Sequence, residues 1–119
     1  MKKTIVLGAS PNPERFSYRA VVSLAKKGFE VFPIGIRTGS IEDHPILNGI
    51  PDIKDVHTIT LYLNKDRQKQ YFGYILKLRP QRVIFNPGTY NKELMNLLGL
   101  NGIEVVEECT LVMLSTGNF

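Results

Sequence analysis

The chain of 119 residues has few of the residues that build cross-linked or metal-rich proteins. It contains two histidines and a single cysteine, Cys109, and it lacks tryptophan. One cysteine excludes an internal disulfide and a multi-cysteine metal site. Long apolar runs are also missing, because only Ile5, Val6 and Leu7 precede Gly8 near the N-terminal end. We therefore expect neither a signal peptide nor a membrane partner, and the cytoplasm is the expected compartment.

A strong charge of one sign is missing as well. The sequence has 15 Lys and Arg against 11 Asp and Glu, which gives a formal net charge of +4. This mild excess suits an anionic ligand such as a polyphosphate. The basic residues are dispersed and are not interleaved with aromatic residues, so no nucleic-acid partner is expected. The length and the hydrophobic fraction of 43% are typical of one globular domain, expected over residues 1–119.

Short apolar runs alternate with longer amphipathic stretches along the chain. This alternation predicts a Rossmann-like α/β fold, with a doubly wound five-stranded parallel sheet in the order 3-2-1-4-5 and helices on both faces. The strands are expected at Thr4–Leu7, 30–34, 58–63, 82–86 and 103–106, and the helices at 17–27, 65–78, 92–98 and 110–114.

Residues 35–56 form a long irregular segment that is rich in Gly, Pro, Asp and Asn. Loops longer than about 12–15 residues in compact domains are often functional, and one short piece of secondary structure is expected within it at 46–50. His44 lies in this segment beside Pro45 without a tight set of metal ligands, so we interpret it as a surface turn residue and expect no metal site. Cys109 lacks an adjacent base and is expected to be buried or half-buried near a helix start, so no catalytic residue is assigned.

The loop after the first expected strand has the features of a phosphate site. In an open α/β sheet, ligands bind beyond the carboxyl ends of the strands at the topological switch point. Gly8 permits a close backbone approach, and the following helix offers unpaired N–H groups and a positive dipole end. Arg15 adds a planar cation, and Ser17 or Ser10 adds a hydroxyl that caps the helix or donates to phosphate. The alternative is that Ser17 only caps the helix and Arg15 is only solvated.

This loop is not the dinucleotide-binding fingerprint. A G-x-G-x-x-G motif would need glycines at the positions of Ser10 and Pro13. An acidic residue for the ribose hydroxyls is also missing at the end of the second expected strand, where Gly35 lies. Arg37, just beyond it, lies where an extra ribose phosphate needs a cation. NADP and coenzyme A (CoA) both carry that phosphate and therefore fit better than NAD.

Five segments carry a family resemblance in their order along the chain. They are GASPNPERFSYRA at 8–20, GFEVFP at 28–33, LNGIPDI at 47–53, NPGTYNKE at 86–93 and GIEVV at 102–106. Together they resemble the small stand-alone CoA-binding proteins, which are similar to the CoA-binding domain of the succinyl-CoA synthetase α subunit. The resemblance implies a Rossmann-like fold that binds the CoA diphosphate at the first loop. It places adenine past the second and third strands, and the pantetheine arm toward the fourth-strand loop.

The expected function is binding of CoA or an acyl-CoA, without catalysis by this chain alone. The resemblance implies this, because enzymes that contain the domain take their catalytic residues from additional domains. Two alternatives stay open: a small NADP-binding oxidoreductase, and an interaction module that keeps the fold without the ligand. Exposed aromatics among Tyr71, Phe72 and Tyr74 would favour the module or a homodimer, since successive aromatics on one helix should not face the same core. The candidate cofactor-binding residues are Gly8, Ala9, Ser10, Asn12, Arg15, Ser17, Tyr18, Gly35, Arg37, Asn86, Pro87 and Gly88.

Overall fold

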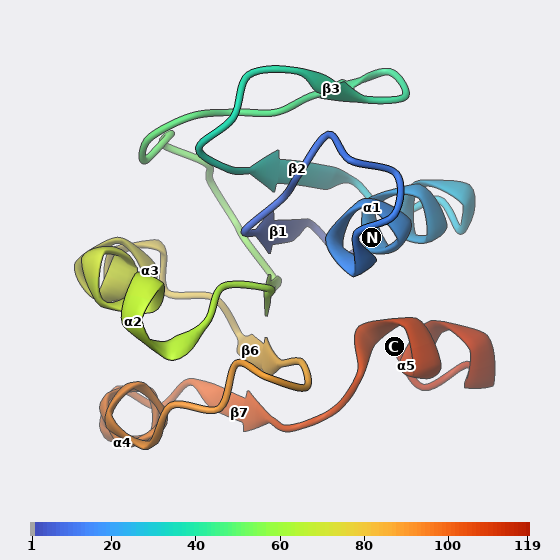
Figure 1. Ribbon diagram of the computed structural model, residues 1–119. Coiled ribbons are helices and arrows are strands. Elements are labelled where there is room, and N and C mark those ends of the chain that lie inside the picture. Colours follow the sequence, from blue (N-terminus) through green and yellow to red (C-terminus); the bar gives the residue numbers. More distant parts are fainter. Residues whose placement is uncertain (1) are drawn as a thin grey trace.

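The computed structural model describes residues 2–119, and a parallel sheet of five strands lies at its centre (Figure 1). Neighbouring strands pair in parallel throughout. Three of the strands are buried at every position, as expected for strands that are covered on both faces. The predicted Rossmann-like α/β fold is confirmed. The five strands are β1 (Thr4–Leu7), β2 (Val31–Ile34), β5 (Thr58–Leu61), β6 (Arg82–Phe85) and β7 (Glu104–Val106).

The spatial order of the five strands is β2-β1-β5-β6-β7. Outside β2, Leu47 forms a single parallel bridge with Ile34. If the Leu47 segment is counted as strand 3, then β2, β1, β5 and β6 are strands 2, 1, 4 and 5, and the predicted order 3-2-1-4-5 is matched. Strand β7 extends the sheet beyond β6. One assignment needs correction, because the strand expected third, at 58–63, lies as β5 directly beside β1 and not outside β2. The switch point is therefore between β1 and β5.

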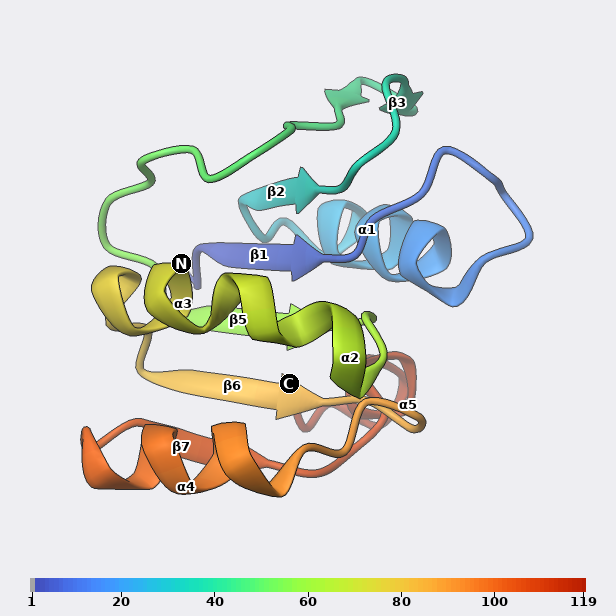
Figure 2. The ribbon, with the colours of Figure 1, turned by 60° about the vertical axis from the view of Figure 1, so that its left-hand side comes forward.

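Helices cover both faces of the sheet (Figures 1 and 2). Helices α1 (Phe16–Lys26) and α5 (Thr110–Thr116) lie together on one face. Helices α3 (Phe72–Leu78) and α4 (Lys92–Leu100) lie on the other face, where they enclose the larger core cluster with β1, β5 and β6. Because all five strands run in the same direction, the loops at their carboxyl ends gather at one end of the sheet (Figure 2). We call this end, formed by the carboxyl ends of the strands, the carboxyl edge.

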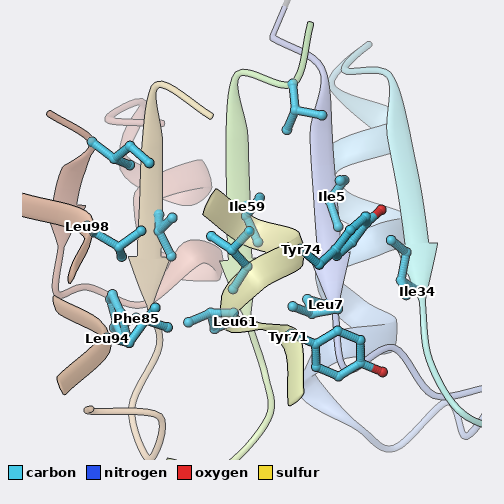
Figure 3. Packing of buried hydrophobic residues seen from close by; sticks show 14 residues of the cluster. Ile5, Leu7, Ile34, Ile59, Leu61, Tyr71, Tyr74, Phe85, Leu94 and Leu98 are labelled. Atoms are coloured by element: carbon cyan, nitrogen blue, oxygen red, sulfur yellow. The ribbon is translucent and has the colours of Figure 1, made fainter. Parts of the chain in front are cut away.

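The stretch expected as one helix at 65–78 is divided into three parts. These are α2 (Lys65–Gln68), the 3-10 turn η1 (Lys69–Tyr71) and α3. The tighter turn changes which side chains face the sheet. Tyr71 and Tyr74 are both buried in the larger core cluster (Figure 3). Phe72 is partly buried and packs against the same cluster. The expectation that these aromatics could not share one core is wrong, and they form no exposed face that would favour an interaction module.

The long segment after β2 contains a small hairpin. Strands β3 (Ser40–Ile41) and β4 (His44–Pro45) pair antiparallel, and Ile41 is fully buried in the core cluster beside α1. The extended residues thus precede the piece expected at 46–50, of which Leu47 alone forms a bridge to the sheet. His44 is partly buried in this hairpin. Leu47 of this segment bridges β2 and Gly39 lies close to Pro11 of the loop after β1, so the segment borders one side of the site described next.

Candidate functional site

A cavity of about 670 Å³ opens at the carboxyl edge of the sheet. Its volume lies within the range of small-molecule sites. Four separate loops line it: those after β1, β2, β5 and β6. This places the cavity at the switch point between β1 and β5, where Rossmann-like folds bind their ligands. The lining residues are Gly8, Ala9, Ser10, Arg15, Phe16, Ser17, Gly35, Ile36, Arg37, Tyr62, Leu63, Asn64, Arg67, Gln70, Tyr71, Pro87, Gly88 and Thr89.

Two glycines let these loops approach one another closely. A Cβ atom on Gly35 would lie 2.2 Å from the backbone oxygen of Ala9, a distance that side chains do not tolerate. A Cβ atom on Gly8 would lie 3.0 Å from atoms of Leu63, and Gly8 has a positive φ of 99°. The backbone of the first loop is thus pressed between the loops after β2 and β5, and glycine is required at both contacts.

The N-terminal end of α1 faces the cavity without a side-chain cap. Its N-cap residue is Arg15, whose side chain makes no capping hydrogen bond. The alternative in which Ser17 only caps the helix is wrong, because Ser17 lies inside the first turn, where it is buried and lines the cavity. Ser10 turns the preceding loop, since its Oγ accepts a hydrogen bond from the N–H of Asn12 at 3.1 Å. The N–H of Tyr18 donates to the backbone oxygen of Arg15, so the N–H groups of Phe16 and Ser17 and the positive end of the helix dipole remain for an anion.

The loop after β2 is held in place by an amide that the sequence reasoning did not single out. The side chain of Asn48 donates hydrogen bonds to the backbone oxygens of Gly35 at 2.7 Å and Arg37 at 3.3 Å. Ile36, between them, lines the cavity and is 69% exposed. Asn48 thereby fixes the backbone that carries Arg37 at the cavity.

A buried amide network fixes the opposite wall. Gln68 of α2 is fully buried and donates hydrogen bonds to the backbone oxygens of Leu63 at 2.9 Å and Thr89 at 2.7 Å. The side-chain oxygen of Gln68 accepts a hydrogen bond from Asn91 at 3.0 Å. Every polar atom of this glutamine has a partner, so the network ties the loop after β5 to the loop after β6.

Nine of the twelve predicted site residues line the cavity, and three do not. Asn86 is buried beneath it, where its amide donates to Thr60 and Leu61 and accepts from the N–H of Thr110. Asn12 is exposed, and its side-chain oxygen accepts a hydrogen bond from the N–H of Glu14. Tyr18 faces a second, shallower hollow beside α1. The lining residues are Gly8, Ala9, Ser10, Arg15, Ser17, Gly35, Arg37, Pro87 and Gly88.

The wall contributed by the β5–α2 segment was missed by sequence reasoning. Asn64, Arg67 and Gln70 lack a motif, and their place at the cavity depends on the break between α2 and α3. Phe16 and Ile36 are apolar residues beside arginines, a pattern that does not separate a ligand contact from an ordinary surface residue. Each is more than 60% exposed although it lines the cavity.

The cavity wall holds little acid–base chemistry. Within residues 2–119, the lining contains no Asp, Glu, His, Cys or Lys. Burial raises the pKa of the Tyr62 phenol well above its usual range, so this group stays neutral at physiological pH. The same residues include no cluster of three or more His, Cys, Asp or Glu that is arranged to hold a metal ion. Cys109 is half-buried ahead of α5 and does not line the cavity.

The fold and the cavity define a class: a Rossmann-like protein with an arginine-lined cavity at the carboxyl edge of its sheet. The chain belongs to the family described as "CoA binding domain", which it matches over residues 2–115. This match spans almost the whole chain and confirms the resemblance drawn from the sequence segments.

Solved structures share the same architecture. A crystal structure of a protein described as uncharacterized is 50% identical, with a TM-score of 0.97 over 100% of this chain and 98% of that one. A hypothetical protein from Pyrococcus horikoshii OT3 is 24% identical, with a TM-score of 0.87 over 97% of this chain and 82% of that one. A conserved hypothetical protein from Pyrococcus furiosus is 25% identical, with a TM-score of 0.82 over 94% and 98% of the two chains.

The search of curated proteins finds no match for this chain. Along residues 2–119, none of the helices has the length and apolar character needed to cross a membrane.

Proposed function

We propose that this chain binds CoA or an acyl-CoA in the cavity at the carboxyl edge, and that it performs no chemistry on its own. The observation that carries the proposal is the uncapped N-terminal end of α1, which opens beside Arg15 into that cavity in a member of the CoA-binding family. An anion at a helix N-terminus gains hydrogen bonds from backbone N–H groups together with the favourable dipole potential. The CoA diphosphate supplies such an anion.

Arg37 supports CoA over ligands that lack the additional ribose phosphate. It lines the cavity from the loop after β2, and Asn48 fixes its backbone. CoA carries a diphosphate and a separate 3′-phosphate, so it needs cations at two places. In the proposed complex, Arg15 beside α1 and Arg37 beyond β2 bind these two groups, since guanidinium matches phosphate in shape and charge.

Two exposed apolar side chains suit the base of the same ligand. Phe16 is 63% exposed and Ile36 is 69% exposed, and both line the cavity next to these two arginines. A planar purine gains free energy by covering such a surface and by stacking on the aromatic ring. On the opposite side, Leu63, Tyr71 and Pro87 offer the apolar surface that an uncharged pantetheine arm needs.

The absence of a catalytic role is part of the proposal. Acyl transfer needs a nucleophile with an adjacent base, and hydride transfer needs an acid or base near the reacting carbon. The described lining residues of the cavity offer serine and threonine hydroxyls but no side chain that takes up protons near neutral pH. This composition suits a protein that holds an acyl-CoA and does not convert it.

A thermal-shift series tests the proposal. CoA, dephospho-CoA, acetyl-CoA, NAD and NADP are compared at equal concentration. A ligand at about 100 times its Kd stabilises the native state by about 2.7 kcal/mol, which raises the Tm of a small domain by several degrees. We expect CoA and acetyl-CoA to raise the Tm most, dephospho-CoA less, and NAD least. Arg15→Ala should abolish the CoA shift, whereas Lys26→Ala, at the far end of α1, should retain it.

Two other outcomes would replace this proposal. A response to NADP alone would indicate a redox protein. A constant Tm with all five ligands would indicate an interaction module that keeps the fold without the ligand.

A further inference from the structure

Arg67 is a third arginine at the cavity, and it comes from a different wall than the other two. Arg15 and Arg37 lie in the loops after β1 and β2, whereas Arg67 lies on α2, after β5. Within residues 2–119, none of the three forms an ion pair with a carboxylate. The cavity therefore has three separate cationic positions and no acidic lining residue among those described.

The backbone on both sides of Arg67 is fixed. The side-chain oxygen of Asn64 caps α2 by accepting a hydrogen bond from the N–H of Arg67 at 3.0 Å. The next residue, Gln68, is fully buried and bonded to Leu63 and Thr89. Arg67 is thus an exposed cation that a rigid helix start holds at the cavity. Asn64 and Gln70 bring two amides to the same wall.

The charges of CoA leave this arginine without a partner. If Arg15 and Arg37 meet the diphosphate and the 3′-phosphate, as proposed above, both anionic groups of CoA are matched. The apolar pair Phe16 and Ile36 then takes the base, so the pantetheine arm extends along the wall formed by the β5 and β6 loops. That arm is uncharged, and a cation on its wall gains nothing from CoA itself.

We infer that Arg67 binds a carboxylate on the acyl group, so that the preferred ligand is the CoA thioester of a dicarboxylic acid. The inference rests on the proposed function, because it takes the orientation of CoA from Arg15, Arg37 and the apolar pair. The guanidinium of Arg67 forms charge-assisted hydrogen bonds with the acyl carboxylate, and the amides of Asn64 and Gln70 add neutral donors beside it. Acyl groups that end in a methyl group lack this contact.

Calorimetric titration with two thioether analogues of equal chain length tests the inference. S-(3-carboxypropyl)-CoA carries the carboxylate, S-butyl-CoA does not, and neither can be hydrolysed as a thioester. The wild type should bind the carboxylate analogue at least about tenfold more tightly, as expected for one charge-assisted contact. Arg67→Ala should remove this preference and leave the affinity for CoA and S-butyl-CoA within about twofold. Lys69→Ala is the control, because Lys69 is exposed close by but does not line the cavity.

Four results would overturn the inference. Equal affinity of the wild type for both analogues shows that no carboxylate is recognised. If Arg67→Ala weakens the binding of CoA but not of dephospho-CoA, Arg67 binds the 3′-phosphate. If it weakens the binding of both ligands equally, Arg67 binds the diphosphate. Failure of the wild type to bind CoA at all contradicts the proposed function itself, and the inference falls with it.

Discussion

Single residues determine how closely the loops of the site approach one another. Gly35 leaves no room for a side chain against Ala9, and Gly8 combines a tight contact with a positive φ. Asn86 acts beneath the cavity, where its amide joins Thr60 of β5 to the N–H of Thr110 at the start of α5. These residues shape the site without contributing charge to it.

The Gly35→Ala substitution should destabilise the protein and weaken CoA binding. The added Cβ would lie 2.2 Å from the backbone oxygen of Ala9, so one loop must shift, at a cost of about 1–3 kcal/mol. Urea unfolding measures the loss. Gly73→Ala is the control, because a Cβ there meets nothing within 4 Å in helix α3, and it should stabilise by about 0.5–1 kcal/mol. An unchanged unfolding midpoint in Gly35→Ala would refute the close approach.

His57 should make the stability depend on pH. Burial, followed by the charges of Arg82 and Lys2, lowers the pKa of His57 in the folded chain. The unfolded chain, with a histidine pKa of about 6.5, then binds the proton more readily. The free energy of unfolding should therefore fall as the pH drops below about 6.5. His57→Gln should show a smaller decrease between about pH 7.5 and 5.5 in urea unfolding. Equal decreases in both proteins would contradict this.

At the scale of elements, the short helix α2 forms one wall of the site. It depends on the buried Gln68, which joins the loop after β5 to the loop after β6. The break at η1 separates two roles of this segment. Helix α2 lines the cavity, whereas Tyr74 of α3 packs in the core and donates a hydrogen bond to the backbone oxygen of Pro51.

Replacing Gln68 should disturb both stability and binding. Gln68→Leu leaves the oxygens of Leu63 and Thr89 and the amide of Asn91 without their partner in a buried place. Each unsatisfied group costs about 1–3 kcal/mol, so we expect a loss of at least about 2 kcal/mol in urea unfolding, together with weaker CoA binding. Gln81→Leu, at an exposed position, should change the stability by less than about 0.5 kcal/mol. Similar stabilities for the two variants would show that the network is dispensable.

Arg79 ends α3 in a left-handed conformation, with φ at 49° and ψ at 57°. Glycine adopts this conformation without steric cost, whereas other L-residues lose about 1–2 kcal/mol. Arg79→Gly should therefore raise the free energy of unfolding by about 1 kcal/mol. Lys77→Gly, inside the same helix, should lower it by about the same amount. Thermal or urea unfolding of both variants measures the contrast, and a loss of stability in both would contradict the left-handed cap.

Elements that a local sequence pattern determines could be predicted from the sequence, whereas elements that depend on contacts between distant residues could not. Apolar runs such as Thr4–Leu7 predict buried strands, because strands covered on both faces need apolar residues throughout. The break between α2 and α3 was missed, since the 3-10 turn depends on packing of Tyr71 against the sheet. Gly8 and Arg15 of the first loop follow from local chemistry. Arg67 does not, because its place at the cavity depends on the buried contacts of Gln68.

At the scale of the whole molecule, the carboxyl and amino ends of the strands differ in whether their arginines are open to a ligand. The carboxyl edge holds the open cavity with three arginines. At the other edge, Arg82 is buried, and its guanidinium lies 4.5 Å from the ring centre of Phe119, which also contacts the ring of Phe29. Its Nε donates a hydrogen bond to Thr58 at 2.8 Å. Because this arginine is enclosed, it is not available to a ligand, which supports the proposed binding of CoA at the carboxyl edge.

Mapping backbone amide shifts by NMR during a titration with CoA tests this central claim most directly. We predict that saturating CoA shifts the amide signals of Gly8, Ser17, Gly35 and Gly88, and leaves those of His57 and Gln81 at the opposite edge unchanged. The Arg15→Ala variant should show none of these shifts at the same CoA concentration. Shifts confined to the amino edge of the sheet, or an unchanged spectrum at millimolar CoA, would contradict the account.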